Sequence, residues 1–307
     1  MKTAFLFSGQ GTQTPGMGKD LYETYDSARK VFDSIHTDFD VKALCFEGPK
    51  EKLDDTQYTQ VAIFAHSMAA AAVLKEKGIT ADVTAGLSLG EYSALCYAGS
   101  FTIQEGAEIL RERGKLMAHA LPAGTRAMAA VLMLDKEAIL QACDAVKEIG
   151  VCEIANYNCP GQIVISGKKA AVEEACEKLK AAGAKRALLL NVSGPFHSGM
   201  LTVAGEKLAQ VLADVEIHTP RIPYVANVNA QFVTTAEPVK DLLTRQVSSS
   251  VRWQQRVEAM INDGVDTFIE IGPGRTLAGF MKKISKEVKT MNVEKLEDIE
   301  KVAEALK

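Results

Sequence analysis

A serine stands at the centre of the pattern in this chain that is best suited to chemistry. Residues 86–91 read Gly-Leu-Ser-Leu-Gly-Glu, with Ser88 between two glycines. The Gly-x-Ser-x-Gly form is typical of a nucleophile elbow, a sharp strand-to-helix turn that exposes a serine oxygen. Residues 81–85 before it favour a strand, and residues 91–98 after it favour a helix that stops at Gly99. A glycine-rich turn with a helix-capping serine is the alternative.

A serine hydroxyl attacks well only when a neighbouring base takes its proton. The chain has five histidines. His197 follows a predicted strand and precedes a predicted helix, at the junction of two predicted domains, where ligand sites tend to gather. We therefore predict that His197 is the base, the alternative being a helix-capping imidazole. The other histidines are expected to pack in the core, to face solvent or to lie at a helix end: His36, His66, His119 and His218.

Two further groups are needed to complete a serine site. Hydrolases with this elbow usually carry an acid between the serine and the histidine in chain order. Asp135 and Asp144 lie in that interval, but both belong to a predicted helix of the small domain, so a backbone carbonyl is a possible acceptor for the imidazole instead. The oxyanion hole needs two N–H donors. The elbow supplies the backbone N–H of Leu89, and the glycine-rich loop 8–11 is the best candidate for the other.

The elements that must position these residues alternate between strands and helices, which predicts a mainly parallel α/β sheet. Strands are predicted at 3–7, 81–85, 222–226, 265–271 and 288–291. Helices are predicted at about 19–37, 60–77, 91–98, 104–120, 199–213, 238–247, 252–263, 275–285 and 293–306. The apolar, alanine-rich helix near 60–77 is expected to be buried on several sides.

The segment 126–192 has a different order. Its predicted strands are 127–134, 151–157, 162–166 and 186–192, and its predicted helices are 135–149 and 170–182. This β-α-β-β-α-β order is the ferredoxin-like arrangement. We therefore predict a large domain formed by residues 1–125 and 194–307, with a small ferredoxin-like domain, residues 126–193, inserted in it.

The composition narrows the class of protein. The 307 residues are 47% hydrophobic and 24% charged, as in ordinary globular proteins, and a net charge of −4 provides no basic field for nucleic acid or an acidic membrane. No apolar run approaches the ~20 residues of a membrane span, and the apolar stretch 4–7 is too short for a signal peptide. The six cysteines form no metal-binding or disulfide pattern. We expect a cytoplasmic protein with reduced thiols, no metal and no nucleic-acid or membrane partner.

Six segments, in this order along the chain, resemble the malonyl-CoA:acyl carrier protein transacylases. They are Phe-Ser-Gly-Gln-Gly-Thr-Gln at 7–13, the elbow and its helix at 86–95, Arg-Gly-Lys-Leu-Met at 113–117, Asn-Tyr-Asn-Cys-Pro-Gly-Gln at 156–162, Pro-Phe-His-Ser at 195–198 and Glu-Ile-Gly-Pro-Gly at 270–274. The match runs from about residue 3 to about residue 292. It implies an α/β-hydrolase-like large domain with a ferredoxin-like insertion.

The resemblance also implies an activity and roles for residues. The family moves a malonyl group from malonyl-CoA to the phosphopantetheine thiol of acyl carrier protein, by a ping-pong route through a malonyl-serine. Both are substrates, no bound cofactor is implied, and we expect a monomer that supplies fatty acid synthesis. By position, Ser88 resembles the nucleophile and His197 the base. Gln10 and Leu89 resemble the backbone donors of the oxyanion hole, and the main-chain carbonyl of Gln246 resembles the group that holds the histidine.

The resemblance assigns further residues to substrate recognition. From the sequence alone Arg113 would be a surface cation on a helix, but by position it resembles the residue that pairs with the malonyl carboxylate. Phe196, just before His197, is expected to crowd the acyl α-carbon and so to favour malonyl over methylmalonyl. Asn156 and Gln162 are expected to line the cleft from the small domain. Basic residues that would meet an acidic carrier protein are Lys185, Arg186, Lys282 and Lys283.

The chain departs from the family pattern at two positions. Leu87 stands where the family commonly has histidine, and Ser250 stands where it often has proline. Two other functions remain open on the residues alone. An acyl-ester hydrolase would use the same elbow, and a non-catalytic binding module could keep the same fold. Arg113 and the missing large-domain aspartate favour the transferase, and intact Ser88, His197 and Arg113 argue against the binding module.

Overall fold

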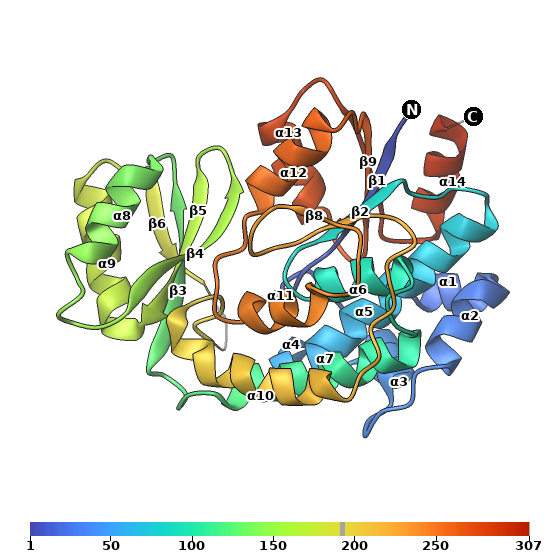
Figure 1. Ribbon diagram of the computed structural model, residues 1–307, viewed down its shortest axis with the longest axis horizontal. Coiled ribbons are helices and arrows are strands. Elements are labelled where there is room, and N and C mark those ends of the chain that lie inside the picture. The colour runs from blue at the N-terminus through green and yellow to red at the C-terminus, as the bar shows by residue number, and fades with distance from the viewer. Residues whose placement is uncertain (191–193, 307) are drawn as a thin grey trace.

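Two β-sheets organise the chain in the computed structural model, which describes residues 1–190 and 194–306 (Figure 1). Within those residues the large sheet has six strands in the order β10-β9-β1-β2-β7-β8, and the small sheet has four in the order β4-β5-β3-β6. Figure 1 shows the small sheet beside the large one, with α8 and α9 on its outer side. The predicted mixed α/β class with a ferredoxin-like insertion is confirmed.

The large sheet is parallel in its centre. Its strands are β1 (Thr3–Phe7), β2 (Val83–Gly86), β7 (Tyr224–Val225), β8 (Phe232–Val233), β9 (Thr267–Ile271) and β10 (Lys289–Val293). β1 pairs in parallel with both β2 and β9, and only β8 runs antiparallel to its neighbour. β1, β2 and β9 are buried at every residue, as strands covered on both faces should be. Because β1 and β2 are parallel, loop 8–11 and the elbow emerge at the same edge.

The helices of the larger part agree with the prediction mainly where they are long. They are α1 (Lys19–Thr24), α2 (Asp26–Asp33), α3 (Val41–Glu47), α4 (Lys50–Asp54), α5 (Thr56–Glu76), α6 (Gly90–Tyr97), α7 (Ile103–His119), the 3-10 turn η1 (Gly199–Leu201), α10 (Thr202–Ala213), α11 (Val239–Gln246), α12 (Trp253–Asn262), α13 (Thr276–Ile284) and α14 (Leu296–Ala305). α5 is buried on several sides, as predicted.

Two predictions in this part were wrong, and three short elements were missed. The single helix predicted over 19–37 is two helices, because the backbone is extended at Tyr25, between them. The strand predicted over 222–226 is only two residues long. The short elements α3, α4 and β8 were not predicted. Helices of five to seven residues and a strand of two residues show too little periodicity to be recognised.

The small sheet has the predicted order of elements. It comprises β3 (Arg126–Leu132), α8 (Lys136–Asp144), β4 (Cys152–Cys159), β5 (Gln162–Lys168), α9 (Lys169–Ala181) and β6 (Arg186–Leu189). Its three strand pairs are antiparallel, and one apolar cluster joins the sheet to both helices. The predicted end of the last strand at 192 and the predicted domain limit at 193 lie outside the described residues.

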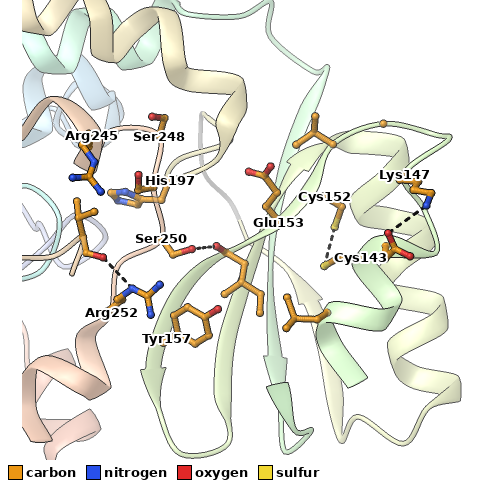
Figure 2. Close-up of a pocket in the computed structure, with 17 residues that line it drawn as sticks. Cys143, Lys147, Cys152, Glu153, Tyr157, His197, Arg245, Ser248, Ser250 and Arg252 are labelled. Atoms are coloured by element: carbon orange, nitrogen blue, oxygen red, sulfur yellow. Dashed lines mark hydrogen bonds and ion pairs between the residues drawn. The ribbon is translucent and has the colours of Figure 1, made fainter. Parts of the chain in front are cut away.

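A short backbone bridge joins the small sheet to the loop that follows α11. The N–H of Tyr157 donates to the carbonyl of Val251 at 2.9 Å, and the N–H of Val251 donates to the carbonyl of Ala155 at 2.8 Å. The Ser250 hydroxyl donates to the carbonyl of Ile154 at 2.5 Å (Figure 2). β4 is therefore tied to a loop only a few residues beyond Gln246, one of the predicted site residues.

Candidate active site

The elbow at residues 86–90 is sterically specified by its glycines. Ser88 has a φ of 52°, in the left-handed region that few serines adopt. A Cβ on Gly86 would lie 1.9 Å from the carbonyl oxygen of Gly90, and a Cβ on Gly90 would lie 2.3 Å from that of Phe7. Only glycine fits at both positions. The tight turn from β2 into α6 holds the Ser88 side chain at the carboxyl edge of the sheet.

His197 lies beside Ser88, although the two residues are far apart in the chain. The Nε2 atom of His197 is 2.8 Å from Ser88 Oγ, and its Nδ1 atom is 2.9 Å from the carbonyl oxygen of Gln246. A carbonyl only accepts, so Nδ1 must carry the proton and Nε2 presents its lone pair to the serine. A backbone carbonyl thus takes the place that an aspartate has in many serine enzymes.

The surroundings of His197 keep its imidazole neutral. Burial lowers the pKa of His197 to about 4, and the positive charge of Arg113 acts in the same direction. The side chain is 4% exposed. At neutral pH the ring can therefore accept a proton, as a general base must.

Arg113 reaches the serine from the opposite direction. It is 1% exposed on α7, and its Nη2 donates to Ser88 Oγ at 3.1 Å and to the side-chain oxygen of Gln246 at 2.8 Å. Its Nη1 donates to the side-chain oxygen of Gln60 at 2.7 Å. Burial lowers the pKa of Arg113. The guanidinium nevertheless stays charged, because the ordinary pKa of an arginine side chain lies above about 12. The surface position that the sequence alone suggested is not what the structure shows.

A cavity of about 830 Å³ opens over these groups. Among its lining residues are predicted site residues from both sheets: Gln10, Ser88, Leu89, Arg113, Asn156, Phe196 and His197. Neither the backbone N–H of Leu89 nor that of Gln10 donates a hydrogen bond within the described part of the chain, so both are available to a ligand. The Gln10 side chain donates to the Thr56 hydroxyl at 2.9 Å, which anchors its loop.

Gln162 lies elsewhere. It is the first residue of β5, at the hairpin turn, where it pairs with Cys159 and Leu132. It is not among the residues that line the cavity over Ser88. Asn156 is on the neighbouring strand, three residues before the end of β4, and does line it. A motif that runs through a hairpin therefore contributes one of its two predicted residues to the cavity.

The structure adds buried residues that sequence reasoning missed. The Asn227 side-chain oxygen accepts from the Ser88 N–H at 3.0 Å, and its amide group donates to the Gly86 carbonyl at 2.9 Å and to Glu91 at 2.6 Å. Arg256 donates to the same Gly86 carbonyl at 2.7 Å. No local pattern marks these partners, because they lie more than a hundred residues from the elbow.

His197 also borders a second cavity, of about 880 Å³, on the side of the small sheet. Figure 2 shows Arg245, Ser248, Ser250 and Arg252 on the large-sheet side of it and Cys143 and Cys152 on the other. The two sulfur atoms are 3.6 Å apart, and both cysteines are free thiols.

The described chain contains no helix that is both long and apolar enough to span a membrane. Within the same residues, no group of three or more histidine, cysteine, aspartate or glutamate side chains is arranged to hold a metal ion.

Comparisons with known proteins agree on one relationship. The family model described as an acyl transferase domain matches residues 4–299. The malonyl CoA-acyl carrier protein transacylase of Bacillus subtilis is 46% identical, over 100% of this chain and 98% of its own. The crystal structure of the enzyme of that name from Clostridium perfringens superposes with a TM-score of 0.97 at 41% identity, covering 100% of this chain and 97% of that one.

A further solved structure contains a partner. It is a type II PKS acyl-carrier protein in complex with its malonyl-transacylase. The matched chain is 40% identical, with a TM-score of 0.96, and covers 99% of this chain and 100% of that one.

Proposed function

The chain belongs to the acyl transferase family, among the malonyl CoA-acyl carrier protein transacylases, and from this premise we propose how its residues transfer a malonyl group from malonyl-CoA to acyl carrier protein. The observation that carries the proposal is the convergence on one oxygen atom. Ser88 Oγ lies 2.8 Å from a neutral imidazole and 3.1 Å from a buried guanidinium. The first can activate the nucleophile, and the second can hold the acid end of the acyl group.

The first half-reaction loads the serine. Ser88 Oγ attacks the thioester carbonyl of malonyl-CoA while His197 Nε2 takes the hydroxyl proton. The negative charge that develops on the carbonyl oxygen is stabilised by the backbone N–H groups of Gln10 and Leu89. The C–S bond then breaks, and His197 returns the proton to the departing CoA sulfur. The Gln246 carbonyl stabilises the imidazolium that exists between these two transfers.

The second half-reaction removes the malonyl group from Ser88. The phosphopantetheine thiol of the carrier protein enters the same cavity, and His197 takes the thiol proton. The thiolate attacks the malonyl ester, and the same two N–H groups hold the oxyanion. When the C–O bond breaks, His197 gives its proton back to Ser88 Oγ and the enzyme returns to its starting state. The phosphopantetheine enters as part of the substrate, and no other cofactor takes part in these steps.

Selection of the acyl group rests on Arg113 and Phe196. The planar guanidinium fork can bind the free malonyl carboxylate through two N–H groups. Charge-assisted bonds of this kind contribute roughly 1.5–3 kcal/mol. Phe196 lines the cavity directly before His197 in the chain, and we propose that it limits the room at the acyl α-carbon. One added methyl group is typically rejected by only ~1–3 kcal/mol.

The remaining parts of the proposal concern the oligomeric state, the compartment, the pathway and the contact with the carrier protein. We propose that the enzyme acts as a monomer in the cytoplasm and supplies fatty acid synthesis. Basic side chains at the mouth of the cavity would meet an acidic carrier protein. Lys282 and Lys283 are on α13, which lines the cavity through Thr276 and Phe280. Lys185 and Arg186 rank second, because Arg186 pairs with Leu132, which also pairs with Gln162 and does not line this cavity.

The experiment that separates a transferase from a hydrolase follows the fate of the acyl-enzyme. The protein is loaded with malonyl-CoA, freed of excess reagent and divided between buffer, holo carrier protein and apo carrier protein. We expect rapid loss of malonyl only with the holo form, and recovery of malonyl on the carrier thiol. Release of free malonate at one rate in all three samples would establish a hydrolase instead.

A further inference from the structure

Glu91 is a buried carboxylate that the proposed chemistry does not use. It follows the elbow directly, on the first turn of α6, and is 1% exposed. One of its oxygens accepts from the Asn227 N–H at 3.2 Å. The other accepts from the Asn227 side-chain amide at 2.6 Å and from the side-chain amide of Gln246. Three N–H donors therefore converge on it, which is the arrangement that suits an ionised carboxylate.

A buried cation supports that charge. Burial raises the pKa of Glu91, and the positive charge of Arg256 opposes that rise. Arg256 is fully buried on α12, where its guanidinium donates to the Gly86 and Val225 carbonyls. The pair lies beneath the elbow, close to the reacting serine.

The carboxylate helps to decide which way two amide side chains point, together with two main-chain carbonyls: the Gln246 amide also donates to the Ser88 carbonyl at 3.0 Å, and the Asn227 amide to the Gly86 carbonyl at 2.9 Å. An amide has a donor end and an acceptor end, and a carboxylate accepts only from the donor end. Because Glu91 takes the NH₂ group of Gln246, the oxygen of Gln246 is left facing Arg113, whose Nη2 donates to it at 2.8 Å. Because Glu91 takes the NH₂ group of Asn227, the oxygen of Asn227 faces the Ser88 N–H. Both functional partners are donors, so both need that orientation.

We propose that Glu91 is a positioning residue that fixes the side-chain amide of Gln246 and, through it, the guanidinium of Arg113, so that it helps to set the preference for a carboxylate-bearing acyl group. The relay runs from Glu91 to Gln246 to Arg113. It deepens the function proposed above and rests on the carboxylate-binding role of Arg113. It gives the Gln246 side chain a task separate from that of its main-chain carbonyl, which holds His197.

A glutamine at position 91 would remove the charge that orients these amides without changing the shape of the side chain. In one orientation its own NH₂ group would face the side-chain amides of Gln246 and Asn227, and in the other it would face the Asn227 N–H. Rotation of the Gln246 amide would relieve the first conflict, but it would turn an NH₂ group toward the Arg113 guanidinium. Two donors would then face each other, and Arg113 would lose a partner that holds it in place.

The test measures the rate of serine acylation by malonyl-CoA and by acetyl-CoA in four proteins: wild type, Glu91→Gln, Arg113→Ala and the double variant. The readout is the ratio of the two values of kcat/KM. We expect Arg113→Ala to lower the ratio at least tenfold, and Glu91→Gln to lower it by several fold, mainly through malonyl-CoA. In the Arg113→Ala background, Glu91→Gln should change the ratio no further, because the relay then has no end point.

A matched control is Glu112→Gln, which removes the same charge from a side chain that is 44% exposed and next to Arg113 in the chain. Its ratio should equal that of wild type. If Glu91→Gln does not fold, Gln246→Met removes the relay amide while keeping the backbone carbonyl, and the ratio should fall in the same way.

The outcomes that overturn the inference are distinct. An unchanged ratio in Arg113→Ala would refute the proposed role of Arg113 and the relay with it. A lowered ratio in Arg113→Ala but not in folded Glu91→Gln, or in Gln246→Met where Glu91→Gln does not fold, would refute the relay alone. An equal loss with both substrates, or a further loss of ratio in the double variant, would mean that Glu91 acts by another route.

Discussion

Ser88, the proposed nucleophile, is held between its proposed base and a cation. His197 accepts the Ser88 hydroxyl proton, while Arg113 donates to the same oxygen. Burial and a nearby cation both disfavour imidazolium in the resting enzyme, and the carbonyl partner at Nδ1 opposes them only through a hydrogen bond, without a negative charge. This combination explains how a base can work at neutral pH without an aspartate.

The pH dependence of acylation follows from this environment. Because the pKa of His197 is lowered to about 4, the base stays neutral at pH values where an ordinary imidazole, with its pKa of 6.5, would be protonated. We expect the rate of acylation by acetyl-CoA to be nearly constant from neutral pH down to about pH 5 and to fall below that. In Arg113→Ala the acid limb should move to higher pH, since a repelling charge is gone.

The measurement is a pH profile of single-turnover acylation in wild type and in Arg113→Ala. Acetyl-CoA serves as the common substrate, because its acyl group carries no carboxylate that could bind Arg113. A wild-type limb near the ordinary imidazole value, or a limb that does not move in the variant, would contradict the electrostatic account.

At this scale the sequence was informative only where chemistry has a local pattern. Ser88 and His197 could be predicted from a motif and from a short count of histidines. Arg113 and the Gln246 carbonyl required the family resemblance, since a helical arginine has no mark of burial and any residue has a carbonyl. Glu91 was visible in the motif, but its partner Asn227 lies 136 positions away and has no local signature.

The elements matter because two parallel strands end at one place. β1 leads into the loop of Gln10, and β2 leads into the elbow, so the two residues proposed to supply the oxyanion hole line one cavity. α6 begins at Gly90, with the Phe7 carbonyl of β1 against its backbone. The close approach of strand, turn and helix is therefore part of the site.

Alanine substitution at two glycines is expected to change the free energy of unfolding in opposite directions. In Gly90→Ala the new methyl group would overlap the Phe7 carbonyl, so we expect a loss of about 3 kcal/mol or more of unfolding free energy. Gly279 is the control, because it is exposed in the middle of α13 and a Cβ there would meet nothing within 4 Å. Gly279→Ala should stabilise the protein by ~0.5–1 kcal/mol.

Chemical denaturation monitored by circular dichroism measures the free energy of unfolding of both variants. Equal stability of Gly90→Ala and wild type would show that the elbow can move aside.

Prediction of elements worked best for long and strongly patterned segments. α5 and α7, and the β-α-β-β-α-β order of the small sheet, could be recognised from periodicity and turn residues. The break at Tyr25 and the short helices α3 and α4 could not, because tertiary packing rather than local sequence decides where such short elements end.

At the scale of the whole molecule, the active cavity is shared by the two sheets. Asn156 comes from the small sheet, whereas Ser88 and Arg113 come from the larger part. The bridge between β4 and Val251 joins the two close to Gln246. The cavity is therefore lined by parts of the chain that lie far apart in the sequence.

At the scale of the whole molecule we predict which surface the carrier protein contacts. Charge reversal in Lys283→Glu should raise the KM for holo carrier protein several-fold and weaken its dependence on salt, because rim charges mainly steer association. Transfer to free pantetheine, an uncharged thiol acceptor, should not change. Lys30→Glu, on α2, is the matched control and should behave as wild type with both acceptors. An equal change in the KM for holo carrier protein in both variants would place the docking surface elsewhere.

The central claim is that Ser88 carries the malonyl group between two thiols. Intact-protein mass spectrometry after brief exposure to malonyl-CoA tests it most directly. The account predicts one added malonyl group in wild type, its loss when holo carrier protein is supplied, and no addition in Ser88→Ala. Wild type that never becomes labelled, or Ser88→Ala that is labelled as fully as wild type, would contradict the account.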